Sequence, residues 1–149
     1  MLNMELIKEI LSWIFWIFVS MLLAVVVVFC VGMKTSVIGS SMEPSLYNGQ
    51  EIFLNRVIYK VTSPKMGDVI VFLPNGNEKS HYYVRRVIAT PGDTVLIQDG
   101  AVYVNGQFYS EKTEVASIDD PGIAGEEIKL GKDEYFVLGD NRNNSEDSR

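Results

Sequence analysis

An uninterrupted apolar run near the amino terminus constrains this chain more than any other feature. From Ile10 to Met33, 24 consecutive residues carry no charge. As an α-helix this run would be about 36 Å long, enough to cross a hydrocarbon core of about 30 Å. Trp13 and Trp16 lie near one end of it, where indole rings favour the membrane interface. We therefore predict a transmembrane helix over residues 10–33.

Two other structures for the apolar run are disfavoured. A cleaved secretory signal has a shorter apolar segment followed by an A-x-A-like site, and no such site follows here. A buried helix needs a partner layer, which the remaining residues do not offer. Lys8 and Lys34 flank opposite ends of the run, so the positive-inside rule hardly separates the two orientations. We expect residues 1–9 in the cytoplasm and residues 34–149 outside it, on the functional grounds given below.

The rest of the chain has the pattern of an all-β domain. Short runs of Val, Ile, Tyr and Phe at strand spacing are bounded by turn residues. The expected strands are Glu51–Tyr59, Asp68–Phe72, Tyr82–Ala89, Thr94–Gln98, Val102–Val104 and Glu134–Leu138. No soluble helix is expected. We predict antiparallel strands in a barrel-like arrangement after one transmembrane helix.

Turn residues mark the connections between these strands. The pair Asp99-Gly100 predicts a β-hairpin, and Asn105-Gly106 and Asn75-Gly76 predict two further tight turns. Residues 34–48 are expected to form a short connection rich in Gly and Ser. Residues 111–125 mix Ser, Asp, Pro and Gly and are expected to form a long surface loop.

Composition narrows the classes of ligand. The net charge is −6 without a basic stripe, which disfavours nucleic-acid binding. The only cysteine, Cys30, lies inside the apolar run, so no disulfide framework exists. Residues 139–149 hold several oxygen ligands, but they lack the Gly and terminal Glu of a calcium loop, and Arg142 would repel a cation. We expect no metal and no cofactor.

Three clusters of residues carry the chemistry. The first is Gly39–Pro44, which on composition alone is a turn. Few residues separate Met33 from Ser41, so an extended chain keeps Ser41 within roughly 25 Å of the membrane surface. A nucleophile there would reach a substrate that is itself leaving the bilayer.

The second and third clusters are Tyr83–Asp93 and Gly139–Arg149. The second would be a strand that runs into a Pro-Gly turn, with Arg85 and Arg86 on opposite faces. By itself it is typical of a charged edge strand. The third follows an apolar strand and is typical of a polar loop that supports a nearby site.

The three clusters, in this order and after one anchor, resemble the bacterial type I signal peptidase family. Three elements match its boxes, namely Ser-Met-x-Pro, Arg-Val-Ile-x-x-Pro-Gly-Asp and Gly-Asp-Asn-Arg-x-x-Ser-x-Asp-Ser-Arg, and Gly67–Phe72 matches a weaker strand box. The single anchor and small outer domain look most like the Gram-positive forms. The resemblance implies a single-pass membrane-bound serine endopeptidase of the cell membrane, of the Ser-Lys dyad type. It would remove N-terminal signal peptides from exported precursors after small residues, without a cofactor.

The resemblance also implies residue roles. Ser41 matches the nucleophile, and its backbone N–H would form the oxyanion hole together with the Gly39 position. Ser145 matches a hydroxyl that orients the general base. Two supporting ion pairs are implied, Arg86 with Asp140 and Arg149 with Asp147. The implied substrate pocket is lined by Met42, Asp68, Val69, Ile70, Val71 and Phe72.

One departure from the family changes the chemistry. The resemblance places the general-base lysine at position 85, where this chain has Arg85. A desolvated lysine can lose its proton near neutral pH, whereas a guanidinium cannot. Lys79 and His81 share the strand parity of Arg85, but they would lie about 20 and 13 Å away along the strand.

Arg85 therefore leaves a second interpretation open. The chain would be a catalytically silent homologue that binds precursors in the same groove and assists secretion or pilus assembly. Members of the family usually continue beyond the last box, so we also expect the chain to be truncated at its carboxyl end. The sequence does not indicate an oligomeric state, and the expected partners are signal peptides and membrane lipid.

Overall fold

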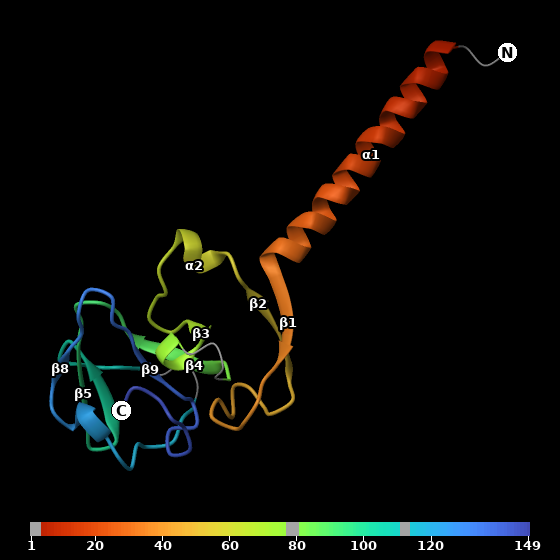
Figure 1. Ribbon diagram of the computed structural model, residues 1–149. Coiled ribbons are helices and arrows are strands. Elements are labelled where there is room, and N and C mark those ends of the chain that lie inside the picture. Colours follow the sequence, from red (N-terminus) through yellow and green to blue (C-terminus); the bar gives the residue numbers. More distant parts are fainter. Residues whose placement is uncertain (1–3, 77–80, 111–113) are drawn as a thin grey trace.

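The structure, a computed structural model, describes residues 4–76, 81–110 and 114–149, and Figure 1 shows one long helix that projects from a small β-domain. In chain order the elements are α1 (Met4–Val31), β1 (Gly32–Ser36), β2 (Glu51–Asn55), α2 (Ile58–Val61), β3 (Val69–Phe72), the 3₁₀ helix η1 (Pro74–Gly76), β4 (Tyr83–Ala89), β5 (Thr94–Gln98), β6 (Ala101–Val104), β7 (Gln107–Phe108), the 3₁₀ helix η2 (Gly122–Gly125), β8 (Ile128–Lys129) and β9 (Phe136–Leu138).

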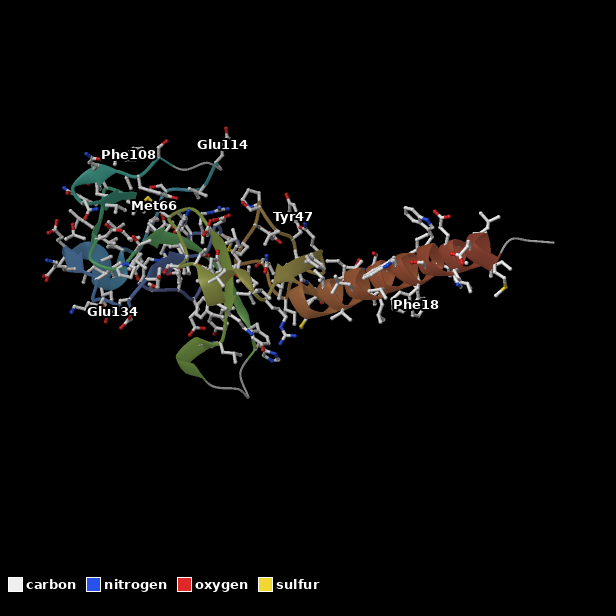
Figure 2. All side chains as sticks on the ribbon, turned by 90° about the horizontal axis from the view of Figure 1, so that it is seen from above. Phe18, Tyr47, Met66, Phe108, Glu114 and Glu134 are labelled. Carbon is white, nitrogen blue, oxygen red and sulfur yellow. The ribbon has the colours of Figure 1, made fainter. Side chains whose placement is uncertain are left out.

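Helix α1 is long and apolar enough to cross a membrane. Its candidate span, Met4–Val28, reaches a mean hydropathy of 2.6, and none of its most apolar window is buried against the domain. Figure 2 shows Phe18 on a part of α1 that stands clear of the β-domain. The helix begins six residues before the predicted Ile10, where Glu5 and Lys8 form an ion pair of 3.1 Å in its first turns.

The described strands form three antiparallel sheets. Their orders are β1-β2, β3-β4-β9 and β7-β6-β5-β8. The antiparallel all-β prediction is confirmed, although these sheets stay separate and do not close into one barrel. Strand β1 follows α1 directly, with Gly32 opposite Asn55, so Gly32 and Met33 belong to a strand and not to the predicted helix.

The predicted hairpin turns are confirmed. Asp99 and Gly100, between β5 and β6, have φ values of 52° and 76°. Asn105 and Gly106, between β6 and β7, have φ values of 51° and 73°. Two successive residues with positive φ match the right-handed twist of the flanking strands, and Asn, Asp and Gly tolerate this conformation best.

The prediction of one strand over Glu51–Tyr59 is wrong, as is the absence of a helix after the anchor. Strand β2 ends at Asn55, whose Oδ1 accepts hydrogen bonds from the N–H groups of Val57 and Ile58, both 3.0 Å long. This side chain competes with the β-ladder for the backbone and turns it into the single helical turn α2.

Other strand boundaries also differ from the predicted ones. Strand β1 occupies part of the predicted connection 34–48, and the two-residue strands β7 and β8 were not predicted. Strand β9 starts at Phe136 and not at Glu134, because Glu134 Oε2 accepts the N–H of Gly131 at 2.7 Å and closes a turn there.

An apolar core joins the two larger sheets. It consists of Ile88, Ala89, Val95, Ile97, Val102, Val104, Ile118, Ala124, Leu130, Phe136 and Leu138, with Tyr109 and Ile128 packed against it. Burial of each large aliphatic side chain contributes about 1.5–3 kcal/mol relative to exposure. This core fixes β4 and β9, the strands that lead into the second and third clusters.

Replacement of a core residue tests this arrangement. Ile88 is fully buried, so Ile88→Ala should lower the free energy of unfolding by about 2–4 kcal/mol. Ile123 is 65% exposed, and Ile123→Ala should change it by less than about 0.5 kcal/mol. Denaturant unfolding of the detergent-solubilised chain, followed by near-ultraviolet circular dichroism, measures both. Equal effects would contradict the assigned core.

Candidate functional site

Ser41 lies in the loop between β1 and β2. The base of this loop is closed by hydrogen bonds from Val37 N–H to the Gln50 carbonyl (2.9 Å) and from Gly49 N–H to the Val37 carbonyl (2.8 Å). Gly39 has a φ of 89° and donates its N–H to Asn48 Oδ1 at 3.0 Å. The loop is thus held by its own polar groups.

A second loop, after β9, holds the Ser41 loop in place. Asn141 N–H donates to the Ser41 carbonyl and Asn141 Nδ2 to the Ser40 carbonyl, both at 3.0 Å. Asn144 Nδ2 donates to Ser40 Oγ at 3.0 Å. A Cβ at Gly139 would lie only 2.5 Å from the Ser41 carbonyl oxygen. Only glycine at position 139 permits the two loops to approach this closely.

Arg85 is held directly on Ser41. Its Nη1 donates to Ser41 Oγ at 2.8 Å and to the Val84 carbonyl at 2.7 Å. Its Nε donates to the Glu146 carbonyl at 2.8 Å, and its Nη2 donates to the same oxygen. The guanidinium also lies 4.8 Å from the centre of the Tyr83 ring. Arg85 is only 5% exposed, so these contacts fix its position.

The charge of Arg85 determines what it can do to Ser41. Burial lowers the pKa of the guanidinium, while the charges of Asp147, Tyr83 and Glu146 act in the opposite direction. A guanidinium remains protonated in proteins and has no acceptor atom. Arg85 therefore donates to Ser41 Oγ and can stabilise negative charge there, but it cannot take the hydroxyl proton.

Arg86 makes the first ion pair implied by the sequence. Its Nε and Nη2 donate to the two carboxylate oxygens of Asp140 at 2.8 and 2.6 Å, and Nη1 donates to the Gly67 carbonyl at 3.0 Å. Burial alone would raise the pKa of Asp140, but hydrogen bonds from Arg86 and Ser45 and the nearby positive charges lower it below its ordinary value. The pair ties β4 to the start of the loop after β9.

Asp147 and Arg149 make the second pair, in which Arg149 Nε and Nη2 reach the two carboxylate oxygens at 2.8 Å each. Ser145 Oγ donates to Asp147 and accepts a hydrogen bond from Arg149 Nη2 at 3.2 Å. Within the described residues, Ser145 makes no hydrogen bond to Arg85. The Glu146 carbonyl takes that position instead, one residue further along the chain.

The oxyanion-hole residues predicted from the sequence differ in availability. The N–H of Gly39 is occupied by Asn48. The N–H of Ser41 has no acceptor in the part of the chain that the structure describes. Of the two, Ser41 thus offers the donor that a substrate oxygen can use.

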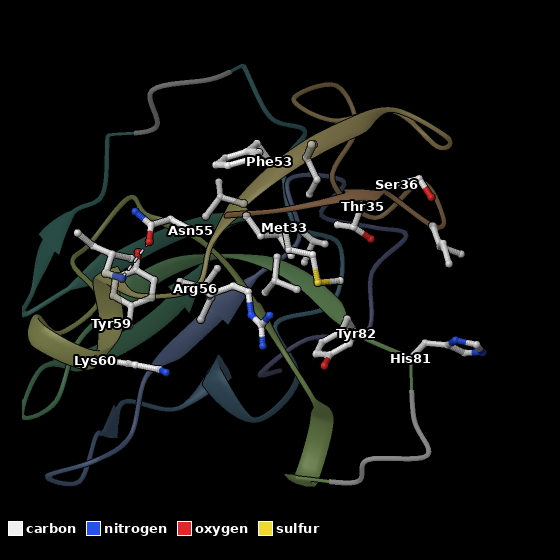
Figure 3. A pocket seen from close by; sticks show the side chains of 18 residues that line it. Met33, Thr35, Ser36, Phe53, Asn55, Arg56, Tyr59, Lys60, His81 and Tyr82 are labelled. Atoms are coloured by element: carbon white, nitrogen blue, oxygen red, sulfur yellow. Dashed lines mark hydrogen bonds between the residues drawn. The ribbon is translucent and has the colours of Figure 1, made fainter. Parts of the chain in front are cut away.

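A groove of about 710 Å³ runs between the β1–β2 hairpin and strands β3 and β4 (Figure 3). Val69, Ile70 and Val71, three of the residues predicted to line a substrate pocket, line this groove. Ile70 pairs with Arg85 across β3 and β4, and Val84 also lines the groove. Neither Ser41 nor Arg85 is among the lining residues, so the link between the groove and the Ser41–Arg85 contact is the pairing of Ile70 with Arg85.

Three predicted pocket residues do not line this groove. Met42, a residue of the Ser41 loop, is fully buried. Asp68 accepts hydrogen bonds from the Tyr59 hydroxyl at 3.0 Å and from Lys65 N–H at 2.9 Å, so it supports the wall and does not face the groove. Phe72 lines a second cavity of about 460 Å³, together with Tyr83 and Glu146 among others.

Among the described residues, the alternative base His81 makes no hydrogen bond to Ser41. His81 is exposed and lies at the outer edge of the groove (Figure 3). Lys79 lies outside the described residues. Among the described residues, no group of three or more His, Cys, Asp or Glu side chains could hold a metal ion.

Sequence reasoning missed several residues that build the site. Asn141 and Asn144 anchor the Ser41 loop, and Tyr83 and Glu146 surround Arg85. Tyr83 also donates its hydroxyl to Glu146 Oε2 at 2.7 Å. The dense polar run Gly139–Arg149 was a signal for such anchoring, but no spacing rule assigns a particular asparagine to a particular carbonyl.

Gly139→Ala tests the contact between the two loops. The added Cβ would meet the Ser41 carbonyl and Ser145 Cβ at 2.5 and 2.4 Å, so the loops should separate. We expect faster amide exchange at Asn141, whose N–H bonds to Ser41. Gly131→Ala is the control, because its Cβ would first meet the flexible end of Glu134 at 3.1 Å. Unchanged exchange in the Gly139 variant would exclude the close approach.

Asp140→Asn tests the buried ion pair. Loss of the charge removes the buried carboxylate that pairs with Arg86, so the free energy of unfolding at pH 7 should fall by about 3–5 kcal/mol. Because the folded-state pKa of Asp140 is depressed, its stabilisation is present above about pH 4 and is lost as pH falls through the folded pKa. The unmodified chain should therefore lose more stability on acidification than the variant. Parallel losses in the two proteins would contradict this.

Known proteins are similar to this chain in sequence over most of its length. A family model described as signal peptidase, peptidase S26, matches residues 10–149. Signal peptidase I P of Bacillus subtilis subsp. natto is 37% identical over 149 residues, which cover 95% of this chain and 80% of the relative. Signal peptidase IB of Staphylococcus aureus (strain COL) is 35% identical over 161 residues, covering 95% and 81%.

One solved structure is also similar. Signal peptidase I from Enterococcus faecalis V583 is 28% identical, with a TM-score of 0.45, and the match covers 59% of this chain and 86% of that one. The family assignment rests on the sequence matches, which span nearly the whole chain. On that evidence, the chain belongs to the signal peptidase family, peptidase S26.

Proposed function

We propose that this chain is a membrane-anchored serine endopeptidase that removes N-terminal signal peptides from exported precursors after small residues. The carrying observation is the 2.8 Å hydrogen bond between Arg85 Nη1 and Ser41 Oγ, with Arg85 paired to Ile70, a residue that lines the apolar groove. It holds a hydroxyl next to an unpaired backbone N–H, which is the arrangement that acyl transfer requires. The relatives named signal peptidase I support the substrate class.

The proposed topology follows from the same function. Residues 1–9 are cytoplasmic, α1 spans the membrane once, and the β-domain lies on the extracytoplasmic side, where exported precursors emerge. Confinement of enzyme and precursor to one membrane face converts their encounter into a nearly intramolecular event. No cofactor takes part.

The precursor binds as an extended segment in the groove. Strand β3 is an edge strand, since the sheet order is β3-β4-β9, and its outer backbone groups can pair with a peptide. The apolar side chains of Val69, Ile70 and Val71 line the groove. In this proposal they contact the small side chains that precede the cleaved bond.

The reaction is an acyl transfer through Ser41. Oγ attacks the carbonyl carbon, and the Ser41 N–H stabilises the oxyanion; loss of one such donor typically costs about 10²–10³ in rate. The C–N bond then breaks, the amine leaves with a proton, and water hydrolyses the acyl-enzyme. Arg85 orients Oγ and stabilises its developing charge. Because Arg85 cannot accept the Ser41 proton, that proton passes to solvent water or hydroxide.

This assignment of roles predicts the kinetics of three variants. Ser41→Ala should abolish cleavage. Arg85→Lys should accelerate it about 10²–10⁴-fold at neutral pH, because a buried lysine can act as a general base. Arg85→Gln, which donates a hydrogen bond but cannot act as a base, should not accelerate it. The measurement is cleavage of a precursor with an A-x-A site by the reconstituted full chain.

The pH dependence of cleavage further distinguishes the role of Arg85 from that of a general base at the same position. Cleavage by the unmodified chain should rise about tenfold per pH unit, as expected for hydroxide-dependent attack, whereas the Arg85→Lys rate should level off above the pKa of the lysine. If the unmodified chain cleaves no more than Ser41→Ala at any pH, the chain is a silent homologue and the proposed activity is wrong.

A further inference from the structure

One end of the groove is positively charged, a feature that the cleavage chemistry does not use. Of the described residues that line the groove, Arg56 and Lys60 are charged and none is Asp or Glu, in a chain with a net charge of −6. Figure 3 shows Arg56 pointing into the groove between Lys60 and Tyr82. This concentration of positive charge favours an anionic ligand.

The two cations are exposed and held at a defined corner of the fold. Within the described part of the chain, neither side chain makes a hydrogen bond or an ion pair, whereas the Lys34 side chain pairs with Glu51 at 2.8 Å. The Asn55 side chain ends β2 and starts α2, which places Arg56 at the corner and Lys60 one helical turn further on. Their backbone positions are therefore fixed before any ligand arrives.

The strand register places this corner beside the end of the membrane helix. Helix α1 ends at Val31, and Gly32, the next residue, pairs with Asn55, the residue before Arg56. Figure 1 shows α2 and the carboxyl end of α1 on the same side of the β-domain. If α1 spans the bilayer, Arg56 lies close to the level at which the chain leaves it.

The surroundings of the cations are those of a membrane-interface segment. On α2, Tyr59 is 41% exposed and Val61 is 76% exposed. Exposed apolar and aromatic side chains interleaved with Arg and Lys are typical of protein surfaces that lie among lipid headgroups, with the cations at the phosphates. An acidic peptide segment would satisfy the charges but not the exposed apolar side chains.

We propose that Arg56 and Lys60 bind the phosphate headgroup of an anionic phospholipid in the leaflet from which α1 emerges. The inference rests on the proposed membrane anchoring, but not on catalysis by Ser41. Each cation near an anionic surface strengthens the association about fivefold at low salt. The contact holds the open end of the groove against the bilayer, where an extended peptide enters it.

The test uses the full-length chain in nanodiscs. Amide exchange is measured over residues 56–62, where the Lys60 and Thr62 N–H groups bond to the Val57 and Ile58 carbonyls. Protection should be at least about fivefold greater with phosphatidylglycerol than with phosphatidylcholine alone, and the difference should vanish at about 1 M salt. The double variant Arg56→Gln/Lys60→Gln should lose this phosphatidylglycerol-dependent protection.

A matched control removes the same charge elsewhere. Lys129→Gln/Lys132→Gln changes two exposed lysines at and beside β8, on the side of the domain away from α1, and should keep the phosphatidylglycerol effect (Figure 1). Equal protection in both lipids, or equal loss in the two double variants, would overturn the proposal. So would protection of the same residues in phosphatidylcholine discs by soluble glycerol phosphate or by an acidic peptide.

Two further measurements distinguish a failure of the headgroup site from a failure of the proposed function. The Ser41→Ala chain should show the same lipid effect, since the headgroup contact does not involve the hydroxyl. Flotation with liposomes tests the anchor independently of the headgroup contact. A chain that does not float would refute the membrane anchoring, whereas a chain that floats without the phosphatidylglycerol effect would refute the headgroup site alone.

Discussion

The contact between the Ser41 loop and the loop after β9 is the constraint on which the site depends. It joins residues about 100 positions apart, through the bonds from Asn141 and Asn144 to Ser40 and Ser41. Chain entropy opposes such a distant closure. The apolar core offsets that cost because it fixes β4 and β9. The bidentate ion pair between Arg86 on β4 and Asp140 then holds the loop after β9 against β4.

Arg85 shows how a local replacement changes chemistry without disturbing the architecture. The guanidinium occupies a position where three neighbours supply acceptors or an aromatic face, namely Val84, Glu146 and Tyr83. A planar group with five donors is well matched to these surroundings. Because the guanidinium can only donate hydrogen bonds, it positions the Ser41 hydroxyl and stabilises negative charge there. It does not provide a group that accepts the hydroxyl proton.

Much of the fold could be predicted from local patterns. The apolar run predicted α1, and the Asp-Gly and Asn-Gly pairs predicted turns with positive φ. The Asn55 side chain could not be recognised in advance, since its bonds to Val57 and Ile58 override an apolar strand pattern. The contact of Arg85 could not be predicted either. Ser145 bonds to Asp147 and Arg149, and the Glu146 carbonyl accepts the hydrogen bond from Arg85 in its place. This arrangement depends on the geometry of the loop, which residue spacing does not reveal.

The direct passage from α1 into β1 leaves no flexible linker between helix and domain. Strand β1 has five residues, and a strand rises about 3.3 Å per residue. Paired along its length with β2, it acts as a stiff spacer of about 17 Å, and the loop with Ser41 begins where it ends. If α1 crosses the bilayer as proposed, this spacer sets the distance of the hydroxyl from the membrane surface, and with it which bond of a membrane-inserted chain lies level with Ser41.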